Sequence, residues 1–190
     1  MPACVSSANR PKRKRSLDDS RRSQLYGPIA ALVAIAILDQ LTKLWALAAL
    51  SDRPPMQILG RAVQFTLVFN EGGAMGTQFG STTYYTVIAI LILPFLGYYL
   101  WKYRTDRATV WPLACILGGA IGNLIDRIRL GKVVDFIDVD IPDIDLSFFQ
   151  LDRFWTFNVA DSAITCAIVF MLAHMIFYRK PQTPELPPTV

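Results

Sequence analysis

The chain has 190 residues, of which 53% are hydrophobic and 18% charged, with a formal net charge of +4. A soluble domain of this length would not normally contain apolar runs of about 20 residues, the length that crosses the hydrocarbon core of a bilayer. The composition therefore excludes an ordinary soluble protein. The excess of positive charge is explained below as a topology signal, so no nucleic-acid partner is expected.

Four apolar runs predict four transmembrane helices, at about residues 27–50, 82–101, 110–128 and 158–178. Backbone groups inside a bilayer must bond within their own segment, so each run is expected to be helical. The first run follows a basic segment, as the apolar part of a cleaved signal peptide would. It is too long for that role and contains charged residues, so we interpret it as a retained span.

The segments between and beyond the runs indicate the topology. Residues 1–24 are polar, basic and rich in serine, which predicts a disordered cytoplasmic tail, and residues 181–190 predict a second, proline-rich cytoplasmic tail. The membrane domain is then expected to cover residues 25–180. Further basic residues lie between the second and third runs and after the fourth. The positive-inside rule therefore places both termini in the cytoplasm and the segments 51–81 and 129–157 outside.

The first span contains Asp39 and Lys43, four residues apart with the acid first, the order that favours an ion pair on one helix face. Two interpretations stay open. Either the pair neutralises itself and lowers the cost of insertion, or Lys43 steadies polar groups that line a site near the outer surface.

The outer segment after the first span contains a β-prone run at 65–69, followed by a glycine-rich stretch that includes Asn70 and Gly72. Glycines after a strand allow tight turns and a close approach of the backbone to a bound chain. This pattern predicts a small β-containing cap outside the membrane. The cap is either a surface on which an extended peptide lies or an ordinary hairpin.

The third span combines small residues with polar residues at its outer end. Gly119, Asn123, Asp126 and Arg127 fall on one helix face by their spacing of three and four residues. Small residues at 118–122 would let a neighbouring helix approach closely. Close packing capped by an Asp126–Arg127 ion pair explains the glycines, but it explains Asn123 beside Asp126 less well.

Two aspartates, Asp135 and Asp161, flank the last outer segment at the outer ends of the third and fourth spans. A carboxylate at the centre of a membrane helix costs about 2.5–3.5 kcal/mol, so it is rarely kept without a function. Two carboxylates brought together share one proton, which is the acid–base pair that a water-activating hydrolase needs. Asp161 alone is equally consistent with a favourable charge in the first turn of a helix, with Asn158 near its cap.

A small carrier or channel is the rival class, with Asp39, Lys43 and Asp126 lining a proton or ion path. Apart from Asp39, however, the acidic residues gather at the outer surface instead of stepping across the bilayer. A scaffold that uses only glycine packing leaves both outer aspartates unexplained. The spacing of the cysteines and of the single histidine is not typical of a metal site, so no metal or other cofactor is expected.

Five motifs in chain order resemble those of the lipoprotein signal peptidases, the signal peptidase II family. They are Asp39-Gln40-x-x-Lys43, Asn70-x-Gly72, Gly118-Gly119-Ala120-x-Gly122-Asn123-x-x-Asp126-Arg127, Gly131-x-Val133-Val134-Asp135-Phe136 and Phe157-Asn158-x-Ala160-Asp161. The resemblance covers nearly the whole region from the first span to the fourth, and the third motif is highly specific. The long basic tail, Met75 where an aromatic residue is common, and the enlarged acidic segment 138–157 depart from the family pattern.

The resemblance implies an all-α integral membrane protein of the bacterial inner membrane, with four transmembrane helices and a small extracytoplasmic β-containing cap. It implies an aspartyl endopeptidase that cleaves diacylglyceryl-modified prolipoproteins just before the lipidated cysteine, without a cofactor. The expected partners are these substrates and membrane lipids, and the enzyme is expected to be monomeric.

By the same resemblance, Asp135 and Asp161 would form the catalytic dyad, facing the extracytoplasmic side. The residues that would shape or support the substrate site are Asn70, Gly72, Gly119, Asn123, Asp126, Arg127, Asn158 and Ala160, with Asp39 and Lys43 behind them.

Overall fold

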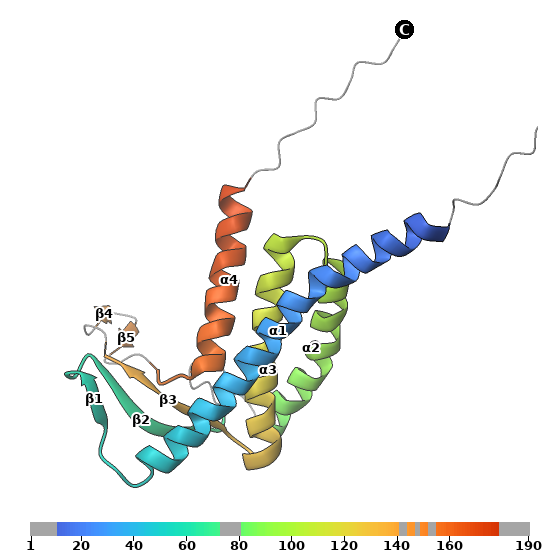
Figure 1. Cartoon of the computed structure of the whole chain (residues 1–190). Helices are drawn as coiled ribbons and strands as arrows, with labels where there is room; N and C mark the ends of the chain where they lie inside the picture. Colours follow the sequence, from blue (N-terminus) through green and yellow to red (C-terminus); the bar gives the residue numbers. More distant parts are fainter. Residues whose placement is uncertain (1–10, 73–80, 141–143, 147–148, 152–154, 179–190) are drawn as a thin grey trace, which may run out of the picture.

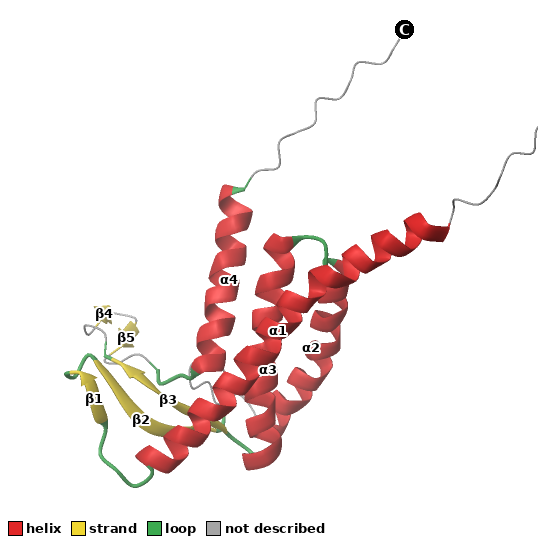
Figure 2. Cartoon of the chain, in the orientation of Figure 1, coloured by secondary structure: helices red, strands yellow, loops and turns green. Residues whose placement is uncertain are grey.

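The computed structural model describes residues 11–72, 81–140, 144–146, 149–151 and 155–178. Helices and strands follow one another as α1 (Pro11–Leu50), β1 (Met56–Leu59), β2 (Val63–Asn70), α2 (Thr82–Lys102), α3 (Arg107–Leu130), β3 (Val133–Val139), β4 (Ile144–Leu146), β5 (Phe149–Leu151) and α4 (Val159–Phe177). Figure 2 shows the helices gathered into one bundle, with the strands beside one end of it.

Four helical segments of the described chain are long and apolar enough to cross a membrane: Gln24–Leu50 within α1, and the whole of α2, α3 and α4. Many of their large apolar side chains point outward, as expected for surfaces that face lipid instead of water. Helix α3 contacts each of the other three helices and is the most buried. The prediction of a four-span, mainly helical membrane protein with a small β-containing part is confirmed.

Helix α1 begins well before the membrane span. The prediction of disorder is therefore wrong for residues 11–24, which continue the span as one helix. Pro11 occupies the first helical position, where a missing N–H costs little. Lysine, arginine and glutamine are good helix formers, and extending an existing helix costs less than starting one. Residues 1–10 and 179–190 lie outside the described residues, as does Met75.

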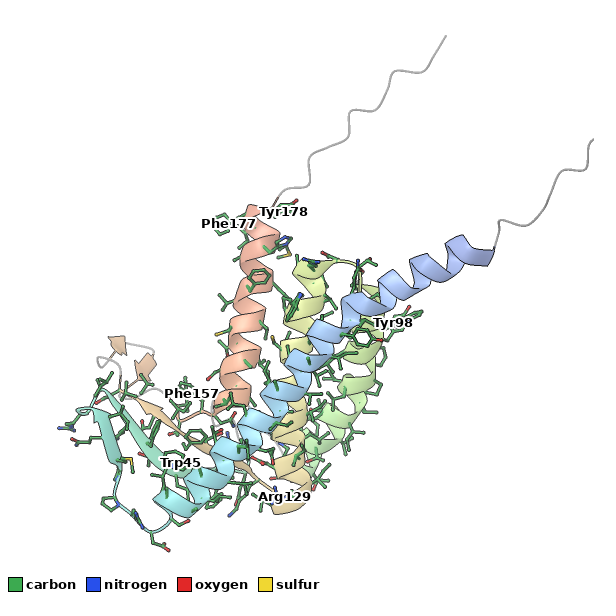
Figure 3. All side chains as sticks on the ribbon, viewed as in Figure 1. Trp45, Tyr98, Arg129, Phe157, Phe177 and Tyr178 are labelled. Carbon is green, nitrogen blue, oxygen red and sulfur yellow. The ribbon has the colours of Figure 1, made fainter. Side chains whose placement is uncertain are left out.

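The start of α1 and the end of α4 lie at the same end of the bundle. In Figure 1 the start of α1, the end of α4 and the connection between α2 and α3 lie at one end of the bundle, which we call the termini end, while the strands lie at the other, the sheet end. Aromatic side chains occur toward both, with Tyr98 and Tyr178 near the termini end and Trp45 and Phe157 near the sheet end (Figure 3). Aromatic residues at two levels are typical of the two membrane–water interfaces.

A three-stranded antiparallel sheet in the order β1-β2-β3 forms the described core of the cap. Strand β2 contains the run that was predicted to be β-prone. Its register with β3 pairs Val68 with Asp135, after an irregularity that follows Phe65. Asp135 therefore belongs to a strand, and the expectation that it lies at a helix end is wrong: α3 stops at Gly131, whose left-handed backbone (φ 70°) turns the chain into β3.

An aromatic cluster fixes this sheet to the bundle. Trp45 of α1, Phe65 of β2 and Phe136 of β3 meet edge to face, with ring centroids 5.3–6.0 Å apart. Ala46 and Leu50 of α1 are buried against Phe136. Because this cluster ties the end of α1 to two strands, it sets the depth at which the neighbouring Asp135 meets the helices.

Close packing on both sides of α3 depends on two glycines. A Cβ added to Gly118 would lie 2.6 Å from the backbone oxygen of Leu32 in α1, and one added to Gly119 would lie 2.6 Å from that of Ala160 in α4. Only a residue without a side chain allows these approaches. The expectation of close helix packing at residues 118–122 is confirmed, and it brings the start of α4 against α3.

Candidate active site

The two aspartates singled out in the sequence are joined through one residue, Asn158, at the start of α4. Its side-chain nitrogen lies 2.7 Å from Oδ1 of Asp135, and its backbone nitrogen lies 3.3 Å from Oδ2 of Asp161. Asn158 and Asp135 are buried, with 0% and 2% of their surfaces exposed. The fold therefore brings both carboxyl groups to one place, where a strand end, α3 and α4 meet.

Helix α4 begins where it does because Asn158 and Asp161 form a capping box. The side-chain oxygen of Asn158 accepts a hydrogen bond from the backbone N–H of Asp161 at 3.0 Å, and the side-chain carboxylate of Asp161 accepts one from the backbone N–H of Asn158. This arrangement satisfies two backbone donors that the first turn would leave unpaired. The expected capping arrangement is present, and it also fixes the direction of the Asp161 carboxyl group.

Asn123 of α3 connects Asp161 and Asn158 to the buried Lys43 of α1. Its side-chain nitrogen donates to Oδ1 of Asp161 at 2.8 Å. Its side-chain oxygen accepts from the ammonium group of Lys43 at 2.8 Å and from the amide of Asn158 at 3.1 Å. Both ends of this buried amide are thus satisfied, and its orientation follows from the lysine, which can only donate.

Lys43 is buried and lies between two carboxylates, 2.8 Å from Asp39 and 2.9 Å from Asp126. Both interpretations of this lysine left open by the sequence are therefore present in the geometry, since it pairs with Asp39 and also holds Asn123. The sequence had suggested an ion pair between Asp126 and its neighbour Arg127. In the structure Asp126 pairs with Lys43 instead. The reason is that Asp126 points toward α1, while Arg127 points toward the end of β2.

The same two carboxylates hold the backbone just before each aspartate of the pair. Oδ1 of Asp39 accepts from the N–H of Ala160 at 3.0 Å, and Oδ2 of Asp126 accepts from the N–H of Val134 at 3.1 Å. Ala160 directly precedes Asp161, and Val134 directly precedes Asp135. The buried ionic cluster centred on Lys43 therefore positions both candidate catalytic groups through the main chain.

Gln40, which the sequence singled out only as part of a motif, also belongs to this cluster. Its side-chain nitrogen donates to Oδ1 of Asp126 at 3.0 Å and to the backbone oxygen of Gly122 at 3.1 Å. The signal that could have identified it is its position: an amide beside Asp39 inside an apolar run needs a polar partner.

Asn70, at the end of β2, approaches the pair from the cap. Its side-chain nitrogen lies 3.1 Å from Oδ2 of Asp135, and its oxygen accepts from the backbone N–H of Gly72 at 3.0 Å. Arg127 reaches the same turn, donating to the backbone oxygen of Gly72 at 3.3 Å. The Nε atom of Arg127 is buried and has no hydrogen-bond partner among the described residues. Every site residue predicted from the sequence thus lies in or against one cluster.

Burial and, to a smaller extent, the nearby charge of Asp161 raise the pKa of Asp135 from 3.8 to about 7. The hydrogen bonds from Asn70 and Asn158 oppose this change because they stabilise the ionised form. A carboxyl group with a pKa near neutrality can hold a proton at physiological pH and release it during a reaction.

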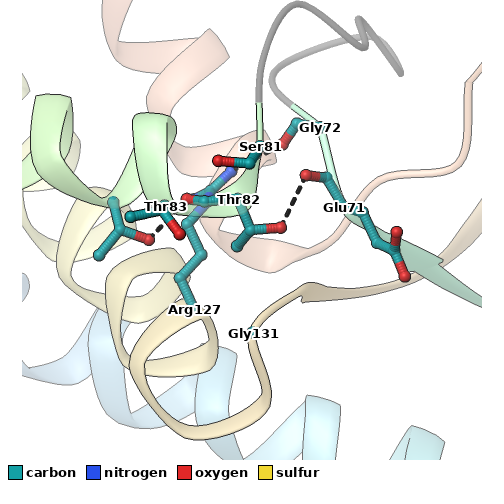
Figure 4. Close-up of a pocket in the computed structure, with 8 residues that line it drawn as sticks. Glu71, Gly72, Ser81, Thr82, Thr83, Arg127 and Gly131 are labelled. Atoms are coloured by element: carbon teal, nitrogen blue, oxygen red, sulfur yellow. Dashed lines mark hydrogen bonds between the residues drawn. The ribbon is translucent and has the colours of Figure 1, made fainter.

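A cleft of about 620 Å³ lies between the end of β2, the start of α2 and the end of α3 (Figure 4), and it shares Gly72 and Arg127 with the site residues described above. Residues that line it are Glu71, Gly72, Ser81, Thr82, Thr83, Thr86, Arg127 and Gly131. The hydroxyl-bearing residues 81–86 were not identified from the sequence, although a run of serine and threonine at the start of a span is an available signal. No group of three or more potential metal-binding side chains occurs within the described residues.

Comparisons with known proteins point to one family. A family model described as signal peptidase (SPase) II matches residues 31–177. A lipoprotein signal peptidase of Coxiella burnetii (strain RSA 493 / Nine Mile phase I) is 39% identical over 151 residues, covering 76% of this chain and 86% of that protein. One of Clostridioides difficile (strain 630) is 31% identical over 151 residues, covering 80% and 95%.

Two solved structures, each described as a bacterial membrane enzyme, have the same fold. The first superposes with a TM-score of 0.66 at 30% identity and covers 79% of this chain and 87% of its own. The second has a TM-score of 0.64 at 28% identity, covering 80% and 93%.

Proposed function

The chain belongs to the signal peptidase II family, and from this premise we propose that it cleaves lipoprotein signal peptides with Asp135 and Asp161 as a catalytic dyad. The substrate would be a prolipoprotein whose cysteine carries a diacylglyceryl group, and the bond cut would be the one just before that cysteine. The observation that carries the proposal is that Asn158 binds both carboxyl groups in a buried site.

In the proposed mechanism the pair shares one proton, and Asp135 holds it before reaction because burial raises its pKa to about 7. Ionised Asp161 takes a proton from water while the water oxygen bonds to the scissile carbonyl carbon. Asp135 gives its proton to the carbonyl oxygen, which completes a tetrahedral diol. When the C–N bond breaks, the amine takes the proton from Asp161, one diol hydroxyl returns its proton to Asp135, and an acid and an amine remain.

Lipid on the substrate would position the scissile bond. The dyad lies at the sheet end, where the cap meets the ends of the apolar helices. A diacylglyceryl group held in the bilayer would place the adjoining peptide bond at that depth, and fixed geometry of this kind can supply several kcal/mol of a reaction barrier. Lipid modification would then be a requirement for position, not for chemistry.

The basic segments at the termini end support a topology with both termini in the cytoplasm and the dyad outside. We propose a monomeric membrane peptidase domain of residues 25–180. A carrier is less well supported, because Asp39, Lys43 and Asp126 form one closed cluster near the sheet end instead of a path across the bilayer.

The direct test is cleavage of a purified diacylglyceryl-modified prolipoprotein by Asp135→Asn and Asp161→Asn variants. Each variant should lose at least about a hundredfold in kcat, the usual size of an acid–base contribution. Asp138→Asn is the matched control, since Asp138 is also a buried carboxyl group of β3 but is bound by Gln64 and Thr66. Near-normal turnover by either dyad variant, in a protein that still inserts into membranes, would rule out the dyad.

Two further measurements separate this proposal from its alternatives. Mass spectrometry of the products should find the lipidated cysteine at the new N-terminus. Chelating agents should leave the rate unchanged, because both proton transfers are assigned to carboxyl groups. Strong inhibition on metal removal would point to another class of hydrolase.

A further inference from the structure

A second cavity, of about 300 Å³, lies at the termini end of the bundle, far from the candidate active site. It is formed where α1 passes the start of α3. The residues that line it, which we call the arginine pocket, are Gln24, Gly27 and Pro28 of α1, Arg104 of the α2–α3 connection, and Arg107 and Trp111 of α3.

The two arginines of this pocket are available for a ligand. Arg104 stacks over the ring of Trp101, with its guanidinium carbon 4.7 Å from the ring centroid, and donates one hydrogen bond of 2.8 Å to the Trp101 backbone oxygen. This holds the guanidinium plane, and a guanidinium group has five N–H donors in all. Arg107 is exposed, and no ion pair joins it to residues 24–72, 81–140 or 155–178.

The acidic residue nearest in sequence, Asp106, does not neutralise these arginines. Its carboxylate caps α3, accepting from the backbone N–H of Ala108 at 3.2 Å and from the hydroxyl of Thr109 at 2.6 Å. The residues that line the pocket therefore include two positive charges and no negative one. A planar guanidinium with paired N–H donors matches phosphate oxygens better than a lysine does.

The side chains around the pocket are typical of the level of the membrane surface. Trp111 packs over Gly27, where an added Cβ would lie 3.1 Å from the indole ring, so the indole fills the wall next to the span. Lys102 lies over the rings of Tyr99 and Tyr103 nearby. Aromatic rings with cationic partners at the end of a span mark the boundary between hydrocarbon and headgroups.

The segment that precedes the arginine pocket in the chain is positively charged, as the pocket is. Residues 1–23 contain seven lysines and arginines against two aspartates. Helix α1 continues through Pro11 without a break, so the backbone of residues 11–23 leads directly away from Gln24 of the pocket. A ligand here must be anionic and must be present at the bilayer surface.

We propose that the arginine pocket binds the headgroup phosphate of an anionic phospholipid, with Arg104 and Arg107 as the phosphate ligands. The acyl chains would extend along the span beside Trp111. A basic pocket between membrane helices has the chemistry that such headgroups require. This inference does not depend on the proposed peptidase mechanism, because the pocket is remote from Asp135 and Asp161.

The test uses the purified full chain in detergent, titrated with phosphatidylglycerol or phosphatidylcholine and followed by native mass spectrometry. The wild-type protein should prefer phosphatidylglycerol by at least about tenfold. Since one basic residue near an anionic surface corresponds to a factor of about five, Arg104→Gln with Arg107→Gln should weaken phosphatidylglycerol binding by about twenty-fivefold. Gln24→Glu, which adds a carboxylate and keeps both arginines, should weaken it as well.

Two controls separate a built pocket from diffuse attraction. Arg53→Gln with Arg61→Gln removes the same charge at the sheet end and should leave the lipid preference intact. Arg104→Lys with Arg107→Lys keeps the charge but loses the planar fork, and should weaken binding. Equal binding by wild type and the Arg104/Arg107 glutamine variant, equal loss in the Arg53/Arg61 variant, or full binding by the lysine variant would each overturn the proposal.

Discussion

Asn158 donates a hydrogen bond of 2.7 Å from its side-chain amide to the carboxyl group of Asp135, a residue on a different element and 23 positions away in the chain. Through its backbone it also binds Asp161. One residue thus combines the cap of α4 with the geometry of the proposed dyad. This coupling means that a change at position 158 should alter both stability and pH dependence.

Replacing Asn158 by alanine should therefore shift the pH–rate profile of prolipoprotein cleavage. The hydrogen bond from Asn158 lowers the pKa of Asp135, so its loss should raise that pKa and move the falling alkaline limb to higher pH. Loss of the cap should also cost about 0.5–2 kcal/mol of stability. Ser162→Ala, which removes only a hydroxyl bound to the Asn158 backbone oxygen, is the control. An unshifted limb in Asn158→Ala would contradict the assignment of Asp135 as the proton donor.

Asp135→Asn should make the protein more stable at alkaline pH while inactivating it. The folded-state pKa of about 7 lies above the ordinary 3.8, so the folded state binds this proton more tightly. The resulting stability is fully present below pH 3.8 and is lost as pH rises through 7. This loss can reach about 4 kcal/mol of the free energy of unfolding, and it is absent from the asparagine variant because asparagine does not titrate.

Apparent melting temperatures in detergent at pH 4.5 and pH 8 provide the measurement. The gain of Asp135→Asn over wild type should be larger at pH 8. Asp138→Asn, measured in parallel, shows whether removal of any carboxyl group from β3 has this effect. A gain that does not change with pH would mean that Asp135 does not titrate in this range.

Lys43→Met should destabilise the protein strongly, by about 3–5 kcal/mol, because it leaves Asp39 and Asp126 buried without their cation. Adding Asp39→Asn and Asp126→Asn to this variant removes the unpaired charges and should restore part of the stability. The comparison is made by thermal unfolding of the three proteins, with Lys132→Met as a variant of a less buried lysine. A triple variant less stable than Lys43→Met alone would argue that the carboxylates are not paired through Lys43.

Gly119→Ala should lower both stability and cleavage. The new methyl group would lie 2.6 Å from the backbone oxygen of Ala160 and 2.9 Å from the side chain of Ile164, so α4 must move and carry Asp161 with it. Overpacking of this kind costs about 1–3 kcal/mol. Gly97→Ala is the matched control in α2, where an added Cβ meets nothing within 4 Å and alanine favours the helix by up to about 1 kcal/mol. Similar melting temperatures for the two variants would contradict the packing argument.

The elements that the sequence predicted well are those governed by local rules. The four spans follow from the length of each apolar run, and the strand at 65–69 follows from its β-branched and aromatic residues. The start of α1 was missed because composition alone does not show that a polar segment continues a helix already formed by the span. Asp135 was placed at a helix end because the turn at Gly131 leaves only a weak signal in the sequence.

For the site, the sequence identified which polar residues are too costly to keep in a membrane without partners, but it left their partners open. The sequence suggested an ion pair between Asp126 and the adjacent Arg127, whereas the structure pairs Asp126 with Lys43. Neighbouring residues on a helix point about 100° apart, so the cation that Asp126 meets depends on which helix packs against that side. Gln40 was overlooked because its partners, Gly122 and Asp126, lie on another helix and cannot be seen from its sequence neighbours.

The amino-acid sequence is enough to identify a four-span membrane protein and the residue types of its polar cluster, because a bilayer admits few structures and makes each buried charge expensive. The pairings between these residues depend on how the helices and strands pack together. Asp39 and Ala160 are 121 positions apart, and their hydrogen bond exists because glycines of α3 let both α1 and α4 pack closely against it. That packing brings the carboxyl groups of Asp135 and Asp161 to the same asparagine, a relationship that no local pattern encodes.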